Sequence, residues 1–267
     1  MKLENKEQII NAVNDADMVL VGLGKEWERI NRWDYDENYK KIFKKITQER
    51  ELLGLIPFLE KDYQHEVLPD IYAKAYANLE RLLKNKNFHV VTLNWDDGLE
   101  NSGVQGDKVV KPCGNYRFLQ CDKGCSEELI NSEEESRNIA KAIIASGGEL
   151  EELRKIKPPR CKKCGSNMVY NTISSEKYRE EGYLEAWGNY TKWLQGTMNK
   201  KVCILELGVG MEFPTVIRWP FEKMAFYNQK ASFFRIHEKW HQMTEELAEK
   251  GYSRQENAVS YCAKLFV

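Results

Sequence analysis

The chain has 267 residues, of which 42% are hydrophobic and 30% charged, and its formal net charge is −1 at pH 7. This composition is typical of a globular protein with one or two domains, and it lacks the basic field that would attract nucleic acid or an anionic membrane. The apolar runs are too short for a membrane span, and residues 1–7 lack the apolar core of a signal peptide. We therefore expect a cytoplasmic protein that binds neither nucleic acid nor membrane.

Four short runs rich in β-branched and aromatic residues predict the strands of a parallel sheet that is covered on both faces. These runs are 17–21, 88–93, 202–207 and 231–236. Helical patterns lie between them, and strands that alternate with helices are typical of a doubly wound, Rossmann-like α/β fold.

Apolar residues at helical spacing predict helices around 39–46 and 71–79. A long helix is expected to open at Ser175 and to continue through Trp187 to Leu194. A last amphipathic helix is expected from about Glu238 to Lys250, ending at Gly251.

Small or polar residues follow each predicted strand. They are Gly22 and Gly24 after the first strand, Asn94 and Asp96 after the second, Gly208, Val209 and Gly210 after the third, and His237 after the fourth. Ligands of open α/β sheets bind beyond the carboxyl ends of the strands, and glycine lets the backbone approach a phosphate. Ordinary turns use the same residue types, and Asn and Asp also cap turns, so the pattern alone leaves both interpretations open.

The segment 111–171 differs from the rest, because it holds five of the seven cysteines and a charged helix over 133–146 but no strong parallel-strand signal. We interpret it as a small module inserted into the α/β domain. The predicted division is a nucleotide-binding domain of residues 1–110 and 172–267, which includes a variable helical segment at 25–68, and a zinc-binding module of residues 111–171.

Two close cysteine pairs lie within this module, Cys121 with Cys125 and Cys161 with Cys164. Paired thiolates on tight turns supply two corners each of the tetrahedron that zinc prefers. Free thiols and a redox dithiol at the second pair are the alternatives, and the dithiol is disfavoured because no thioredoxin-like strand and helix surround it. The spacing therefore predicts a structural zinc site, without which the module should unfold.

Specific stretches resemble the sirtuin superfamily. Thr92, Asn94 and Asp96 match the family's T-Q-N-I-D segment, and Cys113 and Gly114 stand eight residues before Cys121, where the family has His-Gly. The run 204–214 takes the place of the family's G-T-S segment. The details look closest to the macrodomain-linked, class M sirtuins, which are described as ADP-ribosyltransferases that act on a lipoyl-carrier protein.

This resemblance implies structural zinc, and NAD held by Gly22, Gly24, Gly208, Val209, Gly210 and His237 together with the catalytic pair Asn94 and Asp96. Cleavage of the nicotinamide bond has an oxocarbenium-like transition state, whose positive charge a carboxylate at Asp96 would stabilise. Cys113 replaces the family's histidine base, and a thiol is a poor substitute. The expected activity is ADP-ribosyl transfer or NAD cleavage rather than efficient deacylation.

The first loop departs from the family, because Lys25, Glu26, Trp27 and Glu28 stand where small residues would approach the nucleotide. Two carboxylates near a pyrophosphate would repel it. The alternative function is therefore a catalytically inactive sensor of NAD or ADP-ribose, or a protein that docks a partner.

Overall fold

Two sheets organise the fold, and the computed structural model describes residues 5–28, 36–66 and 70–266. The larger sheet has six parallel strands in the order β3-β2-β1-β7-β8-β9. The strands are β1 (Met18–Leu23), β2 (Asn87–Thr92), β3 (Val109–Val110), β7 (Val202–Leu207), β8 (Ser232–Ile236) and β9 (Gly251–Arg254). The doubly wound α/β class is thus confirmed, and the four predicted strands are the four central ones.

Alternating residues of the central strands feed two separate cores. In β1, Val19 and Val21 pack with helices α1 (Asn5–Asp15), α4 (Asp70–Leu83) and α10 (Ala258–Cys262) on one face. Met18 and Leu20 pack on the other face with α8 (Leu184–Gln195) and α9 (Arg218–Tyr227). Successive side chains of β1 point to opposite faces of the sheet, and all of them are buried, so helices cover both faces. The domain is therefore a three-layer sandwich of helices, sheet and helices.

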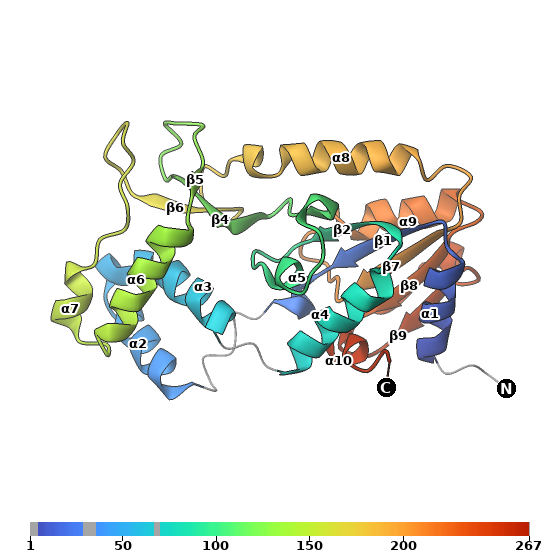
Figure 1. The fold of residues 1–267 in the computed structure, drawn as a ribbon, viewed down its shortest axis with the longest axis horizontal. Helices are drawn as coiled ribbons and strands as arrows, with labels where there is room; N and C mark the ends of the chain where they lie inside the picture. Colours follow the sequence, from blue (N-terminus) through green and yellow to red (C-terminus); the bar gives the residue numbers. More distant parts are fainter. Residues whose placement is uncertain (1–4, 29–35, 67–69, 267) are drawn as a thin grey trace.

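The smaller sheet is antiparallel and lies at the opposite end of the molecule (Figure 1). It consists of β4 (Gly114–Cys121), β5 (Ile130–Asn131) and β6 (Met168–Thr172), accompanied by α6 (Glu133–Ala145) and α7 (Leu150–Lys155). Helices α2 (Glu37–Thr47) and α3 (Ile56–Glu66) share its hydrophobic core, so segment 36–66 packs with the cysteine-containing module. The predicted domain boundaries stay a proposal.

Two predicted helices differ from the structure, because one begins at Leu184 instead of Ser175 and the other, over 238–250, is absent. Residues from Ser175 to Tyr183 precede α8 without joining it, because the side chains of Gln120 and Asn171 bind the carbonyls of Lys177 and Arg179 at 2.7 and 2.8 Å. These side chain–backbone bonds compete with helical ones.

The segment 238–250 contains only a single 3₁₀ turn, Glu245–Leu247, in place of the expected helix. Its carbonyls at Trp240 and Gln242 accept hydrogen bonds from buried arginine side chains at 2.6 Å each. Amphipathic spacing could not reveal that these carbonyls have tertiary partners. Within the described ranges, no helix has the length and apolar character needed to cross a membrane.

Candidate active site and candidate metal centre

The strand order reverses at β1, whose neighbours are β2 and β7, and the exits of these strands converge there. The amide of Gly24 donates to the carbonyl of Leu207 at 2.9 Å, and the amide of Gly208 donates to Ile236 at 2.8 Å. Asn94 Nδ2 donates to the carbonyl of Gly24 at 3.2 Å. The exits that the sequence places at one sheet edge therefore lie together at the topological switch point, where ligands of such sheets bind.

Glycine is required where these loops touch. A Cβ on Gly24 would lie 2.1 Å from the carbonyl oxygen of Gly208 and 2.4 Å from Cα of Val209. Gly208 itself has φ +67°, in the left-handed region that favours glycine. Gly22 lies inside β1, and its missing Cβ leaves room for Ile217, so its surroundings are those of a packing residue.

The divergent first loop, η1 (Lys25–Trp27), distributes its side chains in different directions. Trp27 is fully buried and packs on Tyr76 with ring centroids 5.0 Å apart, so its bulk is directed away from the crevice. Lys25 instead forms an ion pair with Glu28 at 3.0 Å and lies 4.7 Å from the ring centroid of Trp95. Lys25 thus reaches the segment between Asn94 and Asp96.

Glu26 binds backbone amides that belong to two other segments. Its carboxyl oxygens accept from the amide of Glu238 at 2.8 Å and from that of Ala258, the first residue of α10, at 2.7 Å. Burial raises the pKa of Glu26. The loop therefore places its own acidic group on N–H groups at this edge of the sheet.

His237 is neutral although its Nδ1 lies only 3.1 Å from Glu26. Nδ1 accepts hydrogen bonds from the amides of Lys239 and Trp240 at 2.9 and 3.0 Å, which assigns the proton to Nε2. Burial is the main cause that lowers the pKa of His237 to about 4, and Arg218 adds to it. The contact with Glu26 is thus not an ion pair. Nε2 faces Gly210, 3.5 Å from where a Cβ would stand.

Asn94 and Asp96 are both buried, with 3% and 7% exposure. Oδ1 of Asp96 accepts from the amide of Gly98 at 2.7 Å, so the turn-capping interpretation holds for that oxygen. Lys111 donates to the Asp96 carbonyl at 2.6 Å. Oδ1 of Asn94 is buried, and it has no hydrogen-bond partner among the described residues.

Cys113 lies beside this segment as a protonated thiol. Burial raises the pKa of Cys113 to about 11, against an opposing contribution from Lys25. Burial also raises the pKa of Glu60 to about 7, and the neighbouring charge of Glu28 adds to it. Sequence analysis missed Glu60, because its approach to Glu28 depends on how α3 packs.

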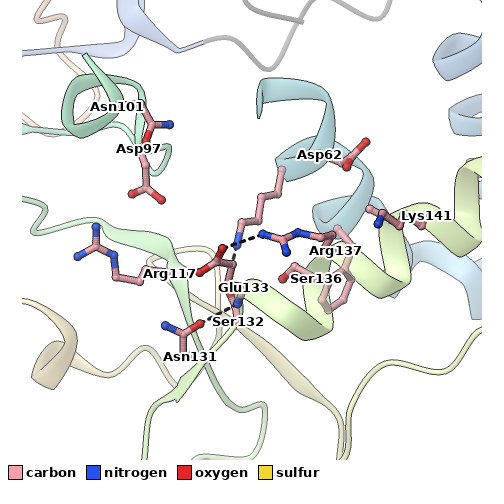
Figure 2. A pocket seen from close by; sticks show the side chains of 13 residues that line it. Asp62, Asp97, Asn101, Arg117, Asn131, Ser132, Glu133, Ser136, Arg137 and Lys141 are labelled. Carbon is pink, nitrogen blue, oxygen red and sulfur yellow. Dashed lines mark hydrogen bonds and ion pairs between the residues drawn. The ribbon is translucent and has the colours of Figure 1, made fainter. Parts of the chain in front are cut away.

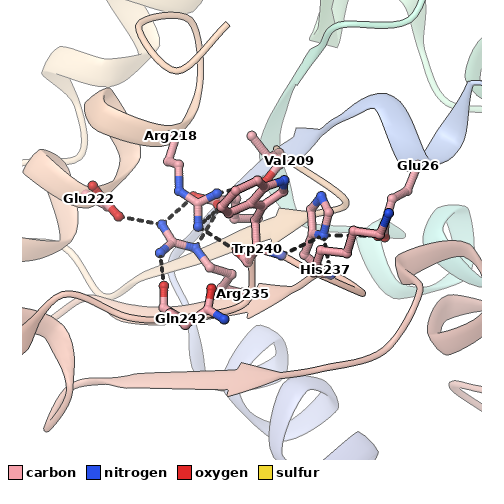
Figure 3. A network of polar contacts seen from close by, with 10 residues as sticks. Glu26, Val209, Arg218, Glu222, Arg235, His237, Trp240 and Gln242 are labelled. Atoms are coloured by element: carbon pink, nitrogen blue, oxygen red, sulfur yellow. Dashed lines mark hydrogen bonds and ion pairs between the residues drawn. The ribbon is translucent and has the colours of Figure 1, made fainter. Parts of the chain in front are cut away.

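A buried ion network holds the loops after β7 and β8 (Figure 3). Glu206 and Arg235 are 0% and 1% exposed, and their side chains meet through two contacts of 2.7 and 3.0 Å. Arg235 also binds Glu222 at 2.6 Å and the Gln242 carbonyl. Arg218 donates to the Val209 carbonyl at 3.1 Å and to the Trp240 carbonyl at 2.6 Å.

Sequence analysis missed this network, although a signal was present. Glu206 and Arg235 are the charged residues of two strands that are otherwise almost entirely apolar, and the β7–β8 register sets them side by side. A charge inside a buried strand requires a partner, so each residue predicted the other once the strands were known to be neighbours.

The four predicted cysteines come together at the small sheet, between the end of β4 and the turn before β6. Their Sγ atoms all lie within 4.8 Å of one another, with three Sγ–Sγ distances of 3.5 Å. Glycines with positive φ, Gly124 and Gly165, form the two turns. A backbone N–H from Ser166 is the main cause that lowers the pKa of Cys164, to about 6, which favours the thiolate that a metal needs. This arrangement can hold one zinc ion tetrahedrally.

No family model matches the chain. Two curated proteins are similar to it. The first, "Protein ADP-ribosyltransferase" of Staphylococcus aureus (strain Mu50 / ATCC 700699), is 21% identical over 266 residues, which cover 93% of this chain and 83% of that protein. The second, "Probable bifunctional ADP-ribose hydrolase/ADP-ribosyltransferase" of Fusarium oxysporum f. sp. cubense, is 30% identical over 138 residues, or 51% of this chain and 23% of that protein.

Solved structures of sirtuins superpose on almost the whole chain. A Sir2 homologue in complex with NAD has a TM-score of 0.56 at 15% identity and covers 97% of this chain and 91% of its own. Sir2Tm bound to a propionylated peptide has a TM-score of 0.55 at 13% identity, with 98% and 97% covered. The chain therefore has the sirtuin fold, as its motifs predicted, while the macrodomain-linked class stays a prediction.

Proposed function

We propose that the chain is an NAD-dependent transferase that cleaves NAD at the nicotinamide bond and passes the ADP-ribosyl group to an acceptor, with little deacylase activity. The observation that carries this proposal is the convergence of Gly24, Asn94 and Gly208 at the switch point of a sirtuin fold. The names of the two similar curated proteins, both of which include ADP-ribosyltransferase, support it.

The residues at the crevice fit a dinucleotide. The buried Oδ1 of Asn94, which has no partner among the described residues, would accept a hydrogen bond from a ribose hydroxyl. Gly210 would leave the backbone open to phosphate, whereas Gly208 and the neighbouring Val209 would become accessible only if Glu26, which lies against Gly208, moves aside. Nε2 of His237 would donate to an acceptor beside Gly210. NAD supplies the cleavable ribose–nicotinamide bond, and the Asp96 carboxylate would stabilise the positive charge that grows on the ribose.

The state of Cys113 supports transfer over deacylation. A thiol with a pKa of about 11 is ionised in only about one molecule in ten thousand at pH 7. It therefore cannot replace the family's imidazole as a base toward a ribose hydroxyl. Transfer depends less on that base, because the acceptor attacks the ribose directly.

The proposed acceptor rests on the sequence resemblance, and the proposed location on the composition of the chain. A protein such as a lipoyl-carrier protein is our proposed acceptor, and the cytoplasm our proposed location. Cys121, Cys125, Cys161 and Cys164 would hold a structural zinc ion that keeps the small module folded.

Glu26 favours a second candidate, an inactive sensor of NAD or ADP-ribose. Its carboxyl group binds two backbone N–H groups at the strand exits, which opposes the approach of a pyrophosphate.

Nicotinamide release from NAD separates the two functions. The variant Asp96→Asn keeps an oxygen that can accept from the Gly98 amide, so its turn should survive. We expect release by the wild type and a loss of roughly 10²–10³-fold in the variant, the range for removing a preorganised electrostatic group. Stabilisation by ADP-ribose without nicotinamide release would identify the sensor, and an absence of both would overturn both candidates. An acetylated peptide consumed as fast as NAD would contradict the transfer preference.

A further inference from the structure

A cavity of about 650 Å³ lies between the small module and the segment that follows β2. Figure 2 shows α3 and α6 on one side of it, with β4 and the turn of α5 (Gly98–Asn101) on the other. Arg117 on β4 and Arg137 on α6 stand on opposite walls. Most of its charged side chains come from segments far apart in the sequence, so the fold assembles this lining.

The acidic side chains of the lining are already bound. Glu133 pairs with Arg137 at 2.7 Å. Asp62 accepts from the Tyr39 hydroxyl at 2.6 Å, and Asp97 pairs with Lys111 at 3.1 Å. Each carboxylate therefore has a hydrogen-bond donor, although Asp62, whose donor is a neutral hydroxyl, keeps its negative charge in the lining.

Three cations of the lining have only neutral partners or none. Lys61 is 9% exposed, and its Nζ donates to the Tyr116 carbonyl at 3.0 Å and to Ser132 Oγ at 2.8 Å. Within the part of the chain that the structure describes, no carboxylate oxygen lies within 4 Å of Lys61, Arg117 or Lys141. Burial lowers the pKa of Lys61, although Asp97 and Glu133 oppose it. Buried lysines without a counter-charge are rare, because desolvation of the ammonium is costly.

The residue before α6 is engaged with Lys61 and not with the helix. Ser132 precedes the helix, but its hydroxyl binds the Tyr116 carbonyl and Lys61 and does not cap the helix. In its place Asn131 Oδ1 accepts from the Glu133 amide at 2.8 Å, and three glutamates of the first turn, Glu133, Glu134 and Glu135, already complement the helix dipole, so the cations of the lining alone would attract an anion.

We propose that this cavity binds a small polar molecule through an oxyanion group, either phosphate or carboxylate, with Lys61 and Arg117 as the principal ligands. The cavity is larger than a bare phosphate, so the oxyanion belongs to a larger ligand. Asp97 and Asn101 also line it, and Lys111 binds both Asp97 and the Asp96 carbonyl. The bound molecule therefore contacts the segment that carries Asp96. This site does not depend on the proposed reaction.

Thermal unfolding of the full chain in inorganic phosphate, in succinate and in chloride at equal ionic strength tests the site. An oxyanion present at about twenty times its Kd should raise Tm by roughly 4–7 °C over chloride. Lys61→Met and Arg117→Gln should each lose more than half of that shift. Lys84→Gln, which removes an exposed cation elsewhere, should keep it.

The two anions distinguish the sources of the oxyanion, since the shift is expected in at least one of them. Phosphate could also bind at the strand exits, but such binding would survive both cavity variants. Equal shifts in the wild type, Lys61→Met and Arg117→Gln, or no shift with either anion, would overturn the site. If Lys61→Met does not fold, Arg117→Gln decides, because Arg117 is exposed and its substitution leaves the core intact. NAD takes no part, so failure here leaves the proposed function untouched.

Discussion

Replacing Glu206 with Gln removes the negative charge at the centre of the buried network while keeping the size of the side chain. Glu206 is 0% exposed and contacts Arg235 through both carboxyl oxygens, at 2.7 and 3.0 Å. A second guanidinium, that of Arg218, lies 4.0 Å away. After the substitution, Glu222 alone would face both cations, and its side chain is 18% exposed.

Removing one partner of a buried ion pair costs about 3–5 kcal/mol, because the other charge stays in a site without water. That is a large part of the roughly 5–15 kcal/mol that stabilises a typical domain. A chain of this size loses about 2–4 °C of Tm per kcal/mol, so Glu206→Gln should lower Tm by about 6–20 °C. The loops after β7 and β8 should loosen first, since the two arginines hold their carbonyls.

Thermal and urea unfolding measure this effect, with Glu152→Gln as the matched control. Glu152 pairs with Lys155 at 2.6 Å, but the two side chains are 55% and 69% exposed, and such surface pairs contribute about 0–1 kcal/mol. The double variant Glu206→Gln with Arg235→Met should cost less than the sum of the single changes, because neither charge is then left alone. Equal Tm values for Glu206→Gln and Glu152→Gln would refute the reasoning.

Three further outcomes are expected. Burial raises the pKa of Glu60 from 4.5 to about 7, so, as far as this group is concerned, the folded protein is most stable below pH 4.5, where the carboxyl group is protonated, and loses stability as the pH rises through 7. Glu60→Gln should therefore raise the free energy of unfolding by up to about 3 kcal/mol at pH 8 and by little at pH 4. A gain in the free energy of unfolding that does not vary with pH would contradict this. Cys164→Ser should lower the zinc content measured by atomic emission and speed proteolysis of the small module, whereas unchanged zinc would exclude the four-cysteine site. Gly24→Ala should cost about 1–3 kcal/mol in urea unfolding, because its Cβ would lie 2.1 Å from the Gly208 oxygen, while Gly188→Ala, with open space in helix α8, should be neutral or stabilising.

The central strands could be predicted because both of their faces are buried, which leaves a continuous apolar run in the sequence. The edge strands β3 and β9 could not, since one has two residues and the other reads Gly-Tyr-Ser-Arg, and only pairing with a neighbour makes them strands. The cysteine cluster was predictable because each pair is local in sequence. The distance between the two cysteine pairs could not be predicted, because it depends on the antiparallel pairing of β4 with β6.

The first loop shows where sequence reasoning reached its limit. Four bulky or charged residues in place of small ones predicted an obstructed crevice, but the largest of them, Trp27, is buried against Tyr76. What stays at the crevice is charge: Glu26 on backbone amides, and Glu28 paired with Lys25. Burial raises the pKa of both carboxyl groups, so each gives up part of its negative charge more readily than an exposed glutamate. A carboxylate can be neutralised by a proton, whereas the bulk of an indole in the crevice could not be removed in that way, and this difference keeps the transferase ahead of the inactive sensor.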